Sequence, residues 1–360
     1  MRSIRTKSNF CDVIRSLAIV LVLACAALAA ANYHVIKRIP IPGDAGWDYI
    51  TADSAGRRLY VPHGTEVVVL DLDSASVVGK IGGLEDAHGV AVAAEFGRGF
   101  ADASDPGSVT IFDLKTLATI GKVKVGDDPN GIIYDSKLKR IFTADRGSKR
   151  LTAIDAKTGM VAGSISLPTG RTEHLASDGA GHVFLNMQDL GKLHKLDVQS
   201  FKIIETWDLL PTCAQPSSMD IDVAHNRIFI GCRGGGASQP PAPTLLAVVD
   251  GSNGKIVDTE PIGPGVDALE FEPASKLIYV STGGGQGTLS IFHQDSPDKY
   301  SLVQNVKTLQ GARTMALDRK TGIVYLPVAD FGPAPAPSAG TPRPRPRTLP
   351  GTFSVLVVGQ

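Results

Sequence analysis

The sequence lacks the common signature motifs of catalysis and nucleotide binding. It contains no His-Glu-x-x-His pair, no Gly-x-Ser-x-Gly turn, no Cys-x-x-Cys pair and no Gly-x-Gly-x-x-Gly at the start of a helix. The glycine-rich stretch 283–287 lies between two predicted strands and is not followed by a lysine, so we interpret it as a turn and not as a phosphate-binding loop. The enzyme classes that these motifs define are therefore not indicated.

Long apolar runs are also scarce, and the clearest one lies near the N-terminus. Four basic residues within the first 15 precede an apolar segment at 17–30, and small residues continue to Ala31. This is the pattern of a secretory signal over residues 1–31. The apolar segment has about 14 residues, fewer than the roughly 20 of a membrane span, so we expect no transmembrane span in the mature chain. Val22-Leu-Ala-Cys25 is a weak lipobox, which leaves a lipoprotein as an alternative to a periplasmic or secreted protein.

Cysteine and net charge are both low. Cys11 and Cys25 lie in the leader, so Cys213 and Cys232 are the only pair in the rest of the chain. Outside the reducing cytoplasm a disulfide between them is favoured over a reactive thiol or a metal-binding pair. Without the leader the chain has 32 basic and 35 acidic residues, a net charge of about −3. We therefore expect no global affinity for nucleic acid.

The chain does contain a repeated unit of short strands separated by turns rich in Gly, Asp, Ser and Lys. Segment 140–163 shows one copy, with two apolar runs that each end in Asp and the start of a further strand. The second strands of the seven copies begin near Arg58, Gly99, Arg140, His182, Arg227, Leu277 and Ile323, and the third strands near Val67, Val109, Leu151, Leu193, Leu245, Leu289 and Phe353. The period of about 44 residues predicts four-stranded propeller blades.

Two of these strands carry a family resemblance. Arg58-Leu-Tyr-Val and Leu277-Ile-Tyr-Val resemble the namesake strand of the YVTN-repeat family of seven-bladed β-propellers, and the chain resembles its YncE-like exported members. The resemblance implies an all-β, WD-repeat-like fold over residues 32–360, with seven four-stranded antiparallel blades. Segment 33–42 resembles a fourth strand and the chain stops after its seventh third strand, so the N-terminal strand is predicted to complete the C-terminal blade. We expect a monomer.

Two proline-rich insertions interrupt the loops between second and third strands. They occupy residues 234–243 in blade five and 333–350 in blade seven. Proline favours extended, unpaired backbone, so both are predicted to be surface loops on one face, usable as a lid or a docking arm for a protein or small-molecule partner. Arg343, Arg345 and Arg347 would point in different directions on a polyproline helix, so we interpret them as a solvated loop and not as a polyanion site.

Polar residues gather where the innermost strands are predicted to begin, near residues 47, 89, 131, 174, 218, 268 and 314. This places them around the upper mouth of the central channel, where they could bind a divalent metal or act as acid and base. The candidate ligand-binding residues are Trp47, Asp48, His63, His88, Asn130, Asp145, Glu173, His174, Ser217, Asp267 and Arg313. Of these, the catalytic candidates are His88, His174 and Glu173, and the metal candidates are Asp48, His88, Glu173 and His174.

Other roles for these residues stay open at this stage. Polar side chains also solvate a wet propeller channel, and Trp47 fits either a stacked ligand or the packing between blades one and seven. The aspartates that follow the third strands are expected to cap turns. Resemblance to YncE-like proteins favours a binding scaffold that uses the loop-rich face and the mouth. The alternative is a channel-mouth enzyme, either a metal-assisted lactonase-type hydrolase or a lyase.

Overall fold

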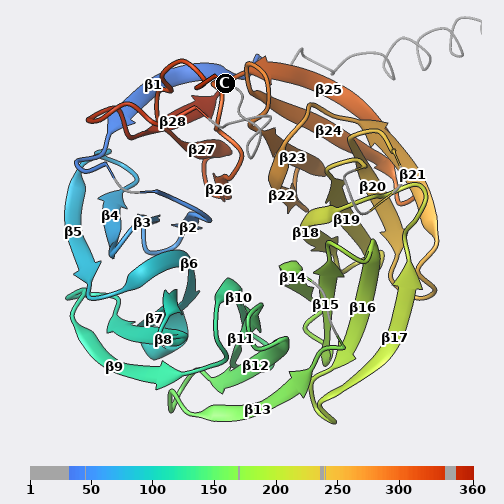
Figure 1. The fold of residues 1–360 in the computed structure, drawn as a ribbon, viewed down its shortest axis with the longest axis horizontal. Helices are drawn as coiled ribbons and strands as arrows, with labels where there is room; N and C mark the ends of the chain where they lie inside the picture. Colours follow the sequence, from blue (N-terminus) through green and yellow to red (C-terminus); the bar gives the residue numbers. More distant parts are fainter. Residues whose placement is uncertain (1–31, 45, 169–170, 236–238, 240, 337–345) are drawn as a thin grey trace, which may run out of the picture.

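A computed structural model describes residues 32–44, 46–168, 171–235, 239, 241–336 and 346–360. The predicted leader, the lipobox cysteine Cys25, and Arg343 and Arg345 lie outside these residues. Within them the chain forms seven four-stranded antiparallel sheets arranged as blades around a central axis (Figure 1). This is the predicted seven-bladed β-propeller. No helix in the described part of the chain is both long enough and apolar enough to span a bilayer.

Each blade has four strands in order from the axis outward. The innermost strands are β2 (Thr51–Asp53), β6 (Glu85–Ala93), β10 (Pro129–Asp135), β14 (Thr172–Ser177), β18 (Pro216–Asp222), β22 (Val266–Glu272) and β26 (Ala316–Asp318). The second strands are β3 (Arg58–His63), β7 (Arg98–Asp105), β11 (Arg140–Asp145), β15 (His182–Met187), β19 (Arg227–Cys232), β23 (Leu277–Thr282) and β27 (Ile323–Val328). A 3₁₀ turn, η1 (Ala94–Phe96), joins β6 to β7 in blade two.

The third and outer strands complete the blades. The third strands are β4 (Glu66–Asp71), β8 (Ser108–Asp113), β12 (Arg150–Asp155), β16 (Lys192–Asp197), β20 (Leu245–Asp250), β24 (Thr288–Ser296) and β28 (Ser354–Gly359). The outer strands are β5 (Val77–Gly82), β9 (Thr119–Lys124), β13 (Val161–Ser166), β17 (Lys202–Asp208), β21 (Ile256–Pro261), β25 (Lys299–Lys307) and β1 (His34–Pro40). The predicted second and third strands are thus all present.

The N-terminal strand closes the ring as predicted. β1 pairs antiparallel with β28, with His34 opposite Gly359 and Pro40 opposite Ser354. Tyr33 also reaches the neighbouring blade six, where its hydroxyl lies 2.9 Å from the hydroxyl of Tyr279. Blade seven therefore takes its outer strand from one end of the chain and its three inner strands from the other.

The second strands supply one buried aromatic ring per blade. At the third position of every second strand stands a Tyr or Phe that is at most 3% exposed: Tyr60, Phe100, Phe142, Phe184, Phe229, Tyr279 and Tyr325. Blade two has a strand at this place although it is poor in β-branched residues. A Cβ at Gly99 of this strand would lie 2.1 Å from the ring of Phe112, so glycine there makes room for that ring. The interior is therefore built from the same aromatic position seven times.

The turns after the third strands and the starts of the innermost strands were also predicted from the sequence. Aspartates after the third strands do cap turns: Asp71 accepts hydrogen bonds from the backbone amides of Asp73 and Ser74 at 3.1 and 2.8 Å. The starts of the innermost strands were less well predicted. β2 begins at Thr51 instead of near residue 47: Trp47 does pair with His63, but only in an isolated bridge, and residues 48–50 lie outside the strand. β6 begins four residues before the predicted position, through an irregular register between Ala87 and Val90.

A polar layer at the channel mouth

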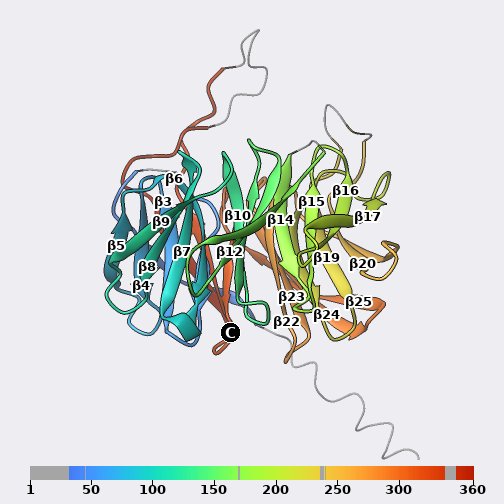
Figure 2. The same cartoon turned by 90° about the horizontal axis from the view of Figure 1, so that it is seen from below.

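Polar side chains from all seven blades form a layer across the upper end of the channel. We call upper the face on which the second strands end and the innermost strands begin; the described flanks of the insertion in blade seven rise from it (Figure 2). The layer consists of Asp48, His88, Asn130, Glu173, Ser217, Asp267 and Arg313, one from each blade in chain order. Six of them stand just before or at the start of an innermost strand, and His88 lies inside β6, next to the register irregularity between Ala87 and Val90.

On one side of the layer, His88 joins the first three blades. Its Nδ1 lies 2.9 Å from Oδ2 of Asp48 and 2.9 Å from the side-chain amide of Asn130, and its Nε2 lies 3.4 Å from Asp86. Burial disfavours a charged imidazole, but the hydrogen bond to Asp48 and the charges of Asp102, Asp48 and Asp86 outweigh it and raise the pKa of His88 to about 9. His88 is therefore a cation at neutral pH.

On the opposite side, Asp267 gathers three donors. Nε of Arg313 donates to its Oδ2 at 2.7 Å, the hydroxyl of Ser217 donates to its Oδ1 at 3.0 Å, and the guanidinium of Arg233 also pairs with Oδ1. Burial raises the pKa of this carboxyl, but Arg233 and Arg313 together hold it below the usual value. Arg313 lies 3.8 Å from Asp48 and so links the two sides.

Glu173 lies between these two groups, and its hydrogen bond and ion pair are longer than theirs. Its side chain is buried, with Tyr49 donating a long hydrogen bond of 3.5 Å to Oε2 and Nε of Arg171 lying 3.3 Å from Oε1. Burial and the nearby negative charge of Asp267 raise the pKa of Glu173 to about 7, against the opposing charges of Arg233, Arg146 and Arg171. Because its pKa is raised, this carboxyl takes up a proton at a higher pH than an exposed glutamate does.

Below the layer, a pair of rings separates the mouth from the main cavity of the channel. Tyr49 and His174 meet edge to face with ring centres 5.0 Å apart. Burial lowers the pKa of His174, so its imidazole is neutral. The cavity beneath has a volume of about 780 Å³ and extends along the innermost strands to residues such as Asp53 and Lys137 near their far ends. His174 therefore faces the channel and not the upper layer.

Besides His174, three predicted site residues lie outside the layer. The ring of His63 stacks on Phe353 at 4.3 Å and is buried, and Trp47 stacks on the same Phe353 at 5.1 Å, so both pack between blades one and seven. Asp145 accepts hydrogen bonds from Thr143 at 2.7 Å, from the backbone amide of Gly126 at 3.0 Å and from Thr152. Because these donors use its buried oxygens within blade three, Asp145 acts as a structural carboxylate.

The four metal candidates do not converge on one point. Asp48 and His88 pair with each other, whereas Glu173 contacts Arg171 and His174 lies against Tyr49. Among the residues that the structure describes, no three or more His, Cys, Asp or Glu side chains are placed to hold a metal ion. What the layer offers instead is hydrogen-bond donors and charges of both signs.

Several residues of the mouth were missed at the sequence level. They are Tyr49, next to Asp48, and three arginines: Arg146, Arg171 and Arg233. Arg146 and Arg233 directly follow the second strands β11 and β19. The predicted candidates His63 and Asp145 are the last residues of second strands, and the position one step further holds Arg146 in blade three and Arg233 in blade five.

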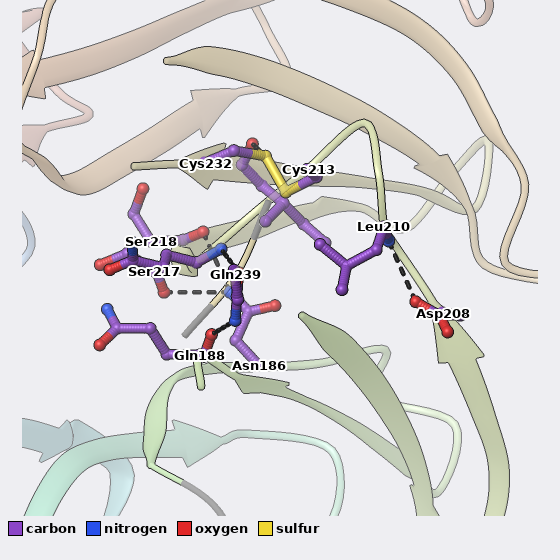
Figure 3. The surroundings of a disulfide bond; sticks show 11 residues. Asn186, Gln188, Asp208, Leu210, Cys213, Ser217, Ser218, Cys232 and Gln239 are labelled. Atoms are coloured by element: carbon purple, nitrogen blue, oxygen red, sulfur yellow. Dashed lines mark hydrogen bonds between the residues drawn. A yellow bond between two sulfur atoms is a disulfide. The ribbon is translucent and has the colours of Figure 1, made fainter. Parts of the chain in front are cut away.

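The base of the insertion in blade five is tied to this layer (Figure 3). A disulfide joins Cys213 to Cys232, with Cα atoms 5.2 Å apart, and Cys232 is directly followed by Arg233. Gln239 of the insertion accepts a hydrogen bond from the backbone amide of Gln215 at 2.6 Å and donates one to the carbonyl of Gln188, also at 2.6 Å. The covalent bridge and these hydrogen bonds hold the backbone next to Arg233 and Ser217.

Comparisons with known proteins identify the fold alone. No protein-family model matches the sequence, and no curated protein matches it. Among solved structures, a chain of Kuenenia stuttgartiensis hydrazine synthase is similar with a TM-score of 0.69 and 16% identity, covering 79% of this chain and 94% of that one. A chain of the mitotic checkpoint complex has a TM-score of 0.70 and 14% identity, covering 97% of each chain. U3-55K has a TM-score of 0.72 and 7% identity, covering 92% of this chain and 99% of that one. The protein is a seven-bladed β-propeller whose upper channel mouth carries an asymmetric polar layer.

Proposed function

We propose that this protein is an exported, YncE-like member of the YVTN-repeat propellers that serves as a binding scaffold, recognising a small-molecule ligand or partner with its upper face. The observation that carries the proposal is the composition of the polar layer. Seven blades of one repeated design contribute seven positions to it, and these hold two aspartates and a histidine, asparagine, glutamate, serine and arginine. A site for one asymmetric ligand requires such differences between blades that are otherwise alike.

Export rests on the pattern of residues 1–31 and on the disulfide between Cys213 and Cys232, which suits an oxidising compartment. Expression of the full chain with fractionation of the cells tests it. The expected product is a periplasmic or secreted protein with a new N-terminus near Asn32. A protein retained in the cytoplasm with residues 1–31 intact would refute export.

One observation favours an enzyme at the same place. Glu173 has its pKa raised to about 7, where a carboxyl can both give and take a proton at neutral pH. His88 does not suit the role of base, because its imidazole is already protonated there. The enzymatic alternative is therefore a lyase or hydrolase that uses Glu173. Turnover that disappears in Glu173→Gln would support it.

The binding function is tested by native mass spectrometry. The mature protein is incubated with a desalted small-molecule extract, washed, and examined for bound mass. The expected result is one retained ligand that is lost in Arg313→Gln, which removes a donor of the layer, and kept in Arg58→Gln, which changes an arginine paired with Asp71 at the opposite end of blade one. Equal retention by the two variants would exclude the mouth as the site.

A further inference from the structure

Two arginines at the mouth each pair with one carboxylate, but at more than the ordinary hydrogen-bond distance. The Nε of Arg146 is buried and has no hydrogen-bond partner among the described residues. Its nearest carboxylate oxygen, Oδ2 of Asp128, is 3.6 Å away, and the other oxygen of Asp128 accepts a hydrogen bond from Ser104. Arg171 has only Glu173 as an ionic partner in the described part of the chain, and its side chain is 53% exposed. Both guanidinium groups therefore keep N–H donors for a ligand.

The other two arginines differ. Arg233 and Arg313 both pair with Asp267, whose two oxygens are fully used, and Arg233 also donates to the carbonyl of Val266 at 2.9 Å. They are held in place by this shared carboxylate. Guanidinium N–H groups without a close acceptor are thus found at Arg146, directly after β11 of blade three, and at Arg171, directly before β14 of blade four.

We propose that Arg146 and Arg171 bind the carboxylate of a small organic acid at the junction of blades three and four, beside Glu173. The inference rests on the proposed binding function and names its ligand class. A planar guanidinium matches a carboxylate with two parallel hydrogen bonds, which a single ammonium does not. The charges of Glu173, Asp128 and Asp267 around the arginines favour a singly charged anion over a phosphate dianion.

Glu173 gives this site a dependence on pH. The charged or titratable groups that act on it come from five elements: Tyr49 ahead of β2, Arg146 after β11, Arg171 ahead of β14, Arg233 after β19 and Asp267 of β22. The protonated form of Glu173 neither repels an incoming carboxylate nor competes with it for Arg171. The ionised form does both. Affinity for a carboxylate is therefore expected to fall as the pH rises from 6 to 8.

Saturation-transfer difference NMR on the methyl signal of acetate tests the site, with inorganic phosphate as the dianion. We expect saturable acetate binding at pH 6. The dissociation constant should rise about tenfold or more in Arg146→Gln and in Arg171→Gln, and stay unchanged in Arg58→Gln. Glu173→Gln, which imitates the protonated carboxyl, should bind acetate equally at pH 6 and pH 8. If Arg146→Gln does not fold, the acetate affinity of Arg171→Gln, which changes an exposed side chain, still tests the site.

Three outcomes would overturn the assignment: no saturable acetate binding by the wild type, tighter binding of phosphate than of acetate at pH 7, or equal binding by Arg171→Gln and Arg58→Gln. The native mass spectrometry separates this failure from failure of the binding function. If the ligand found by mass spectrometry depends on Arg313 but acetate does not bind, the binding function stands and the carboxylate site is refuted. If neither the ligand nor acetate binds, both proposals are refuted.

Discussion

The outer strand β1 offers a sharp test of how the ring is held closed, because it carries two isoleucines in opposite environments. Ile39 is 8% exposed, lies opposite Val355 of β28 and belongs to the core cluster between blades one and seven. Ile36, three residues earlier on the same strand, is 45% exposed. Replacing each with alanine makes the same chemical change and leaves the backbone pairing to β28 intact.

The expected magnitudes follow from burial. Truncating a buried isoleucine to alanine costs about 2–5 kcal/mol, and the position of Ile39 near the rim of its cluster places it at about 2–3 kcal/mol. Ile36→Ala should remain within about 0.5 kcal/mol of the wild type. With an unfolding entropy of about 2.1 cal/mol/K per residue, Ile39→Ala should lower Tm by about 3–4 °C. Deleting residues 32–42 removes the buried side chains of Tyr33, Ile39 and Ile41 together and should cost at least 5 kcal/mol.

Urea denaturation followed by circular dichroism, together with thermal melts, measures these differences. Light scattering of the deletion variant adds a second readout, because an uncovered β28 presents an unpaired sheet edge that favours association. The reasoning would be wrong if Ile39→Ala and Ile36→Ala had the same midpoint. It would also be wrong if the deletion variant kept a cooperative melt near the wild-type temperature.

Three further outcomes are expected. Replacing Cys213 and Cys232 with alanine should lower the free energy of unfolding by about 3 kcal/mol, since the bridge spans 19 positions of the chain; equal urea midpoints would contradict this. For His88→Gln, the loss of stability should be largest at or below pH 6.5 and should shrink as the pH rises through 9, because the native pKa of about 9 exceeds the ordinary value near 6.5; a difference independent of pH would disprove it. Asp145→Ala should cost about 2–4 kcal/mol in urea denaturation, because three donors lose a buried acceptor, and should leave acetate affinity unchanged; weaker acetate binding at an unaltered midpoint would instead place Asp145 in the site.

The sequence was a good guide to the blades because their second and third strands are uniformly buried. Strands such as β11 and β12 present short apolar runs with a repeating Asp at the end, and the recurrence every 44 residues or so makes each copy support the others. The innermost strands are harder to place. β2 and β26 have three residues each, and the innermost strands line the channel, so they do not show the apolar runs of strands in a sheet interior.

The site was predictable only in part, because the role of some residues depends on contacts with residues distant in the sequence. Asp48 and His88 were found because they stand where innermost strands lead in. Trp47 and His63 occupy comparable places, but Phe353 comes from the last blade and stacks on both, which turns them into the packing between blades. A contact between residues nearly 300 positions apart cannot be read from local pattern. Burial likewise decides whether a carboxylate stays ionised beside an arginine, as Asp267 does, or has its pKa raised, as Glu173 does, and local sequence does not show burial.

The pairing of His34 with Gly359 also has a consequence for how the molecule folds. Six blades can form from neighbouring segments as soon as those segments exist, whereas the seventh must wait for both ends of the chain to meet. Bringing ends about 320 residues apart together costs about 5 kcal/mol in chain entropy by the logarithmic estimate. That cost falls in the closing step, and it raises the contact order of the whole fold. Attaching residues 32–42 after Gln360 instead would keep the antiparallel pairing of β1 with β28 while making the last blade local, so the rearranged chain should fold faster to the same ring.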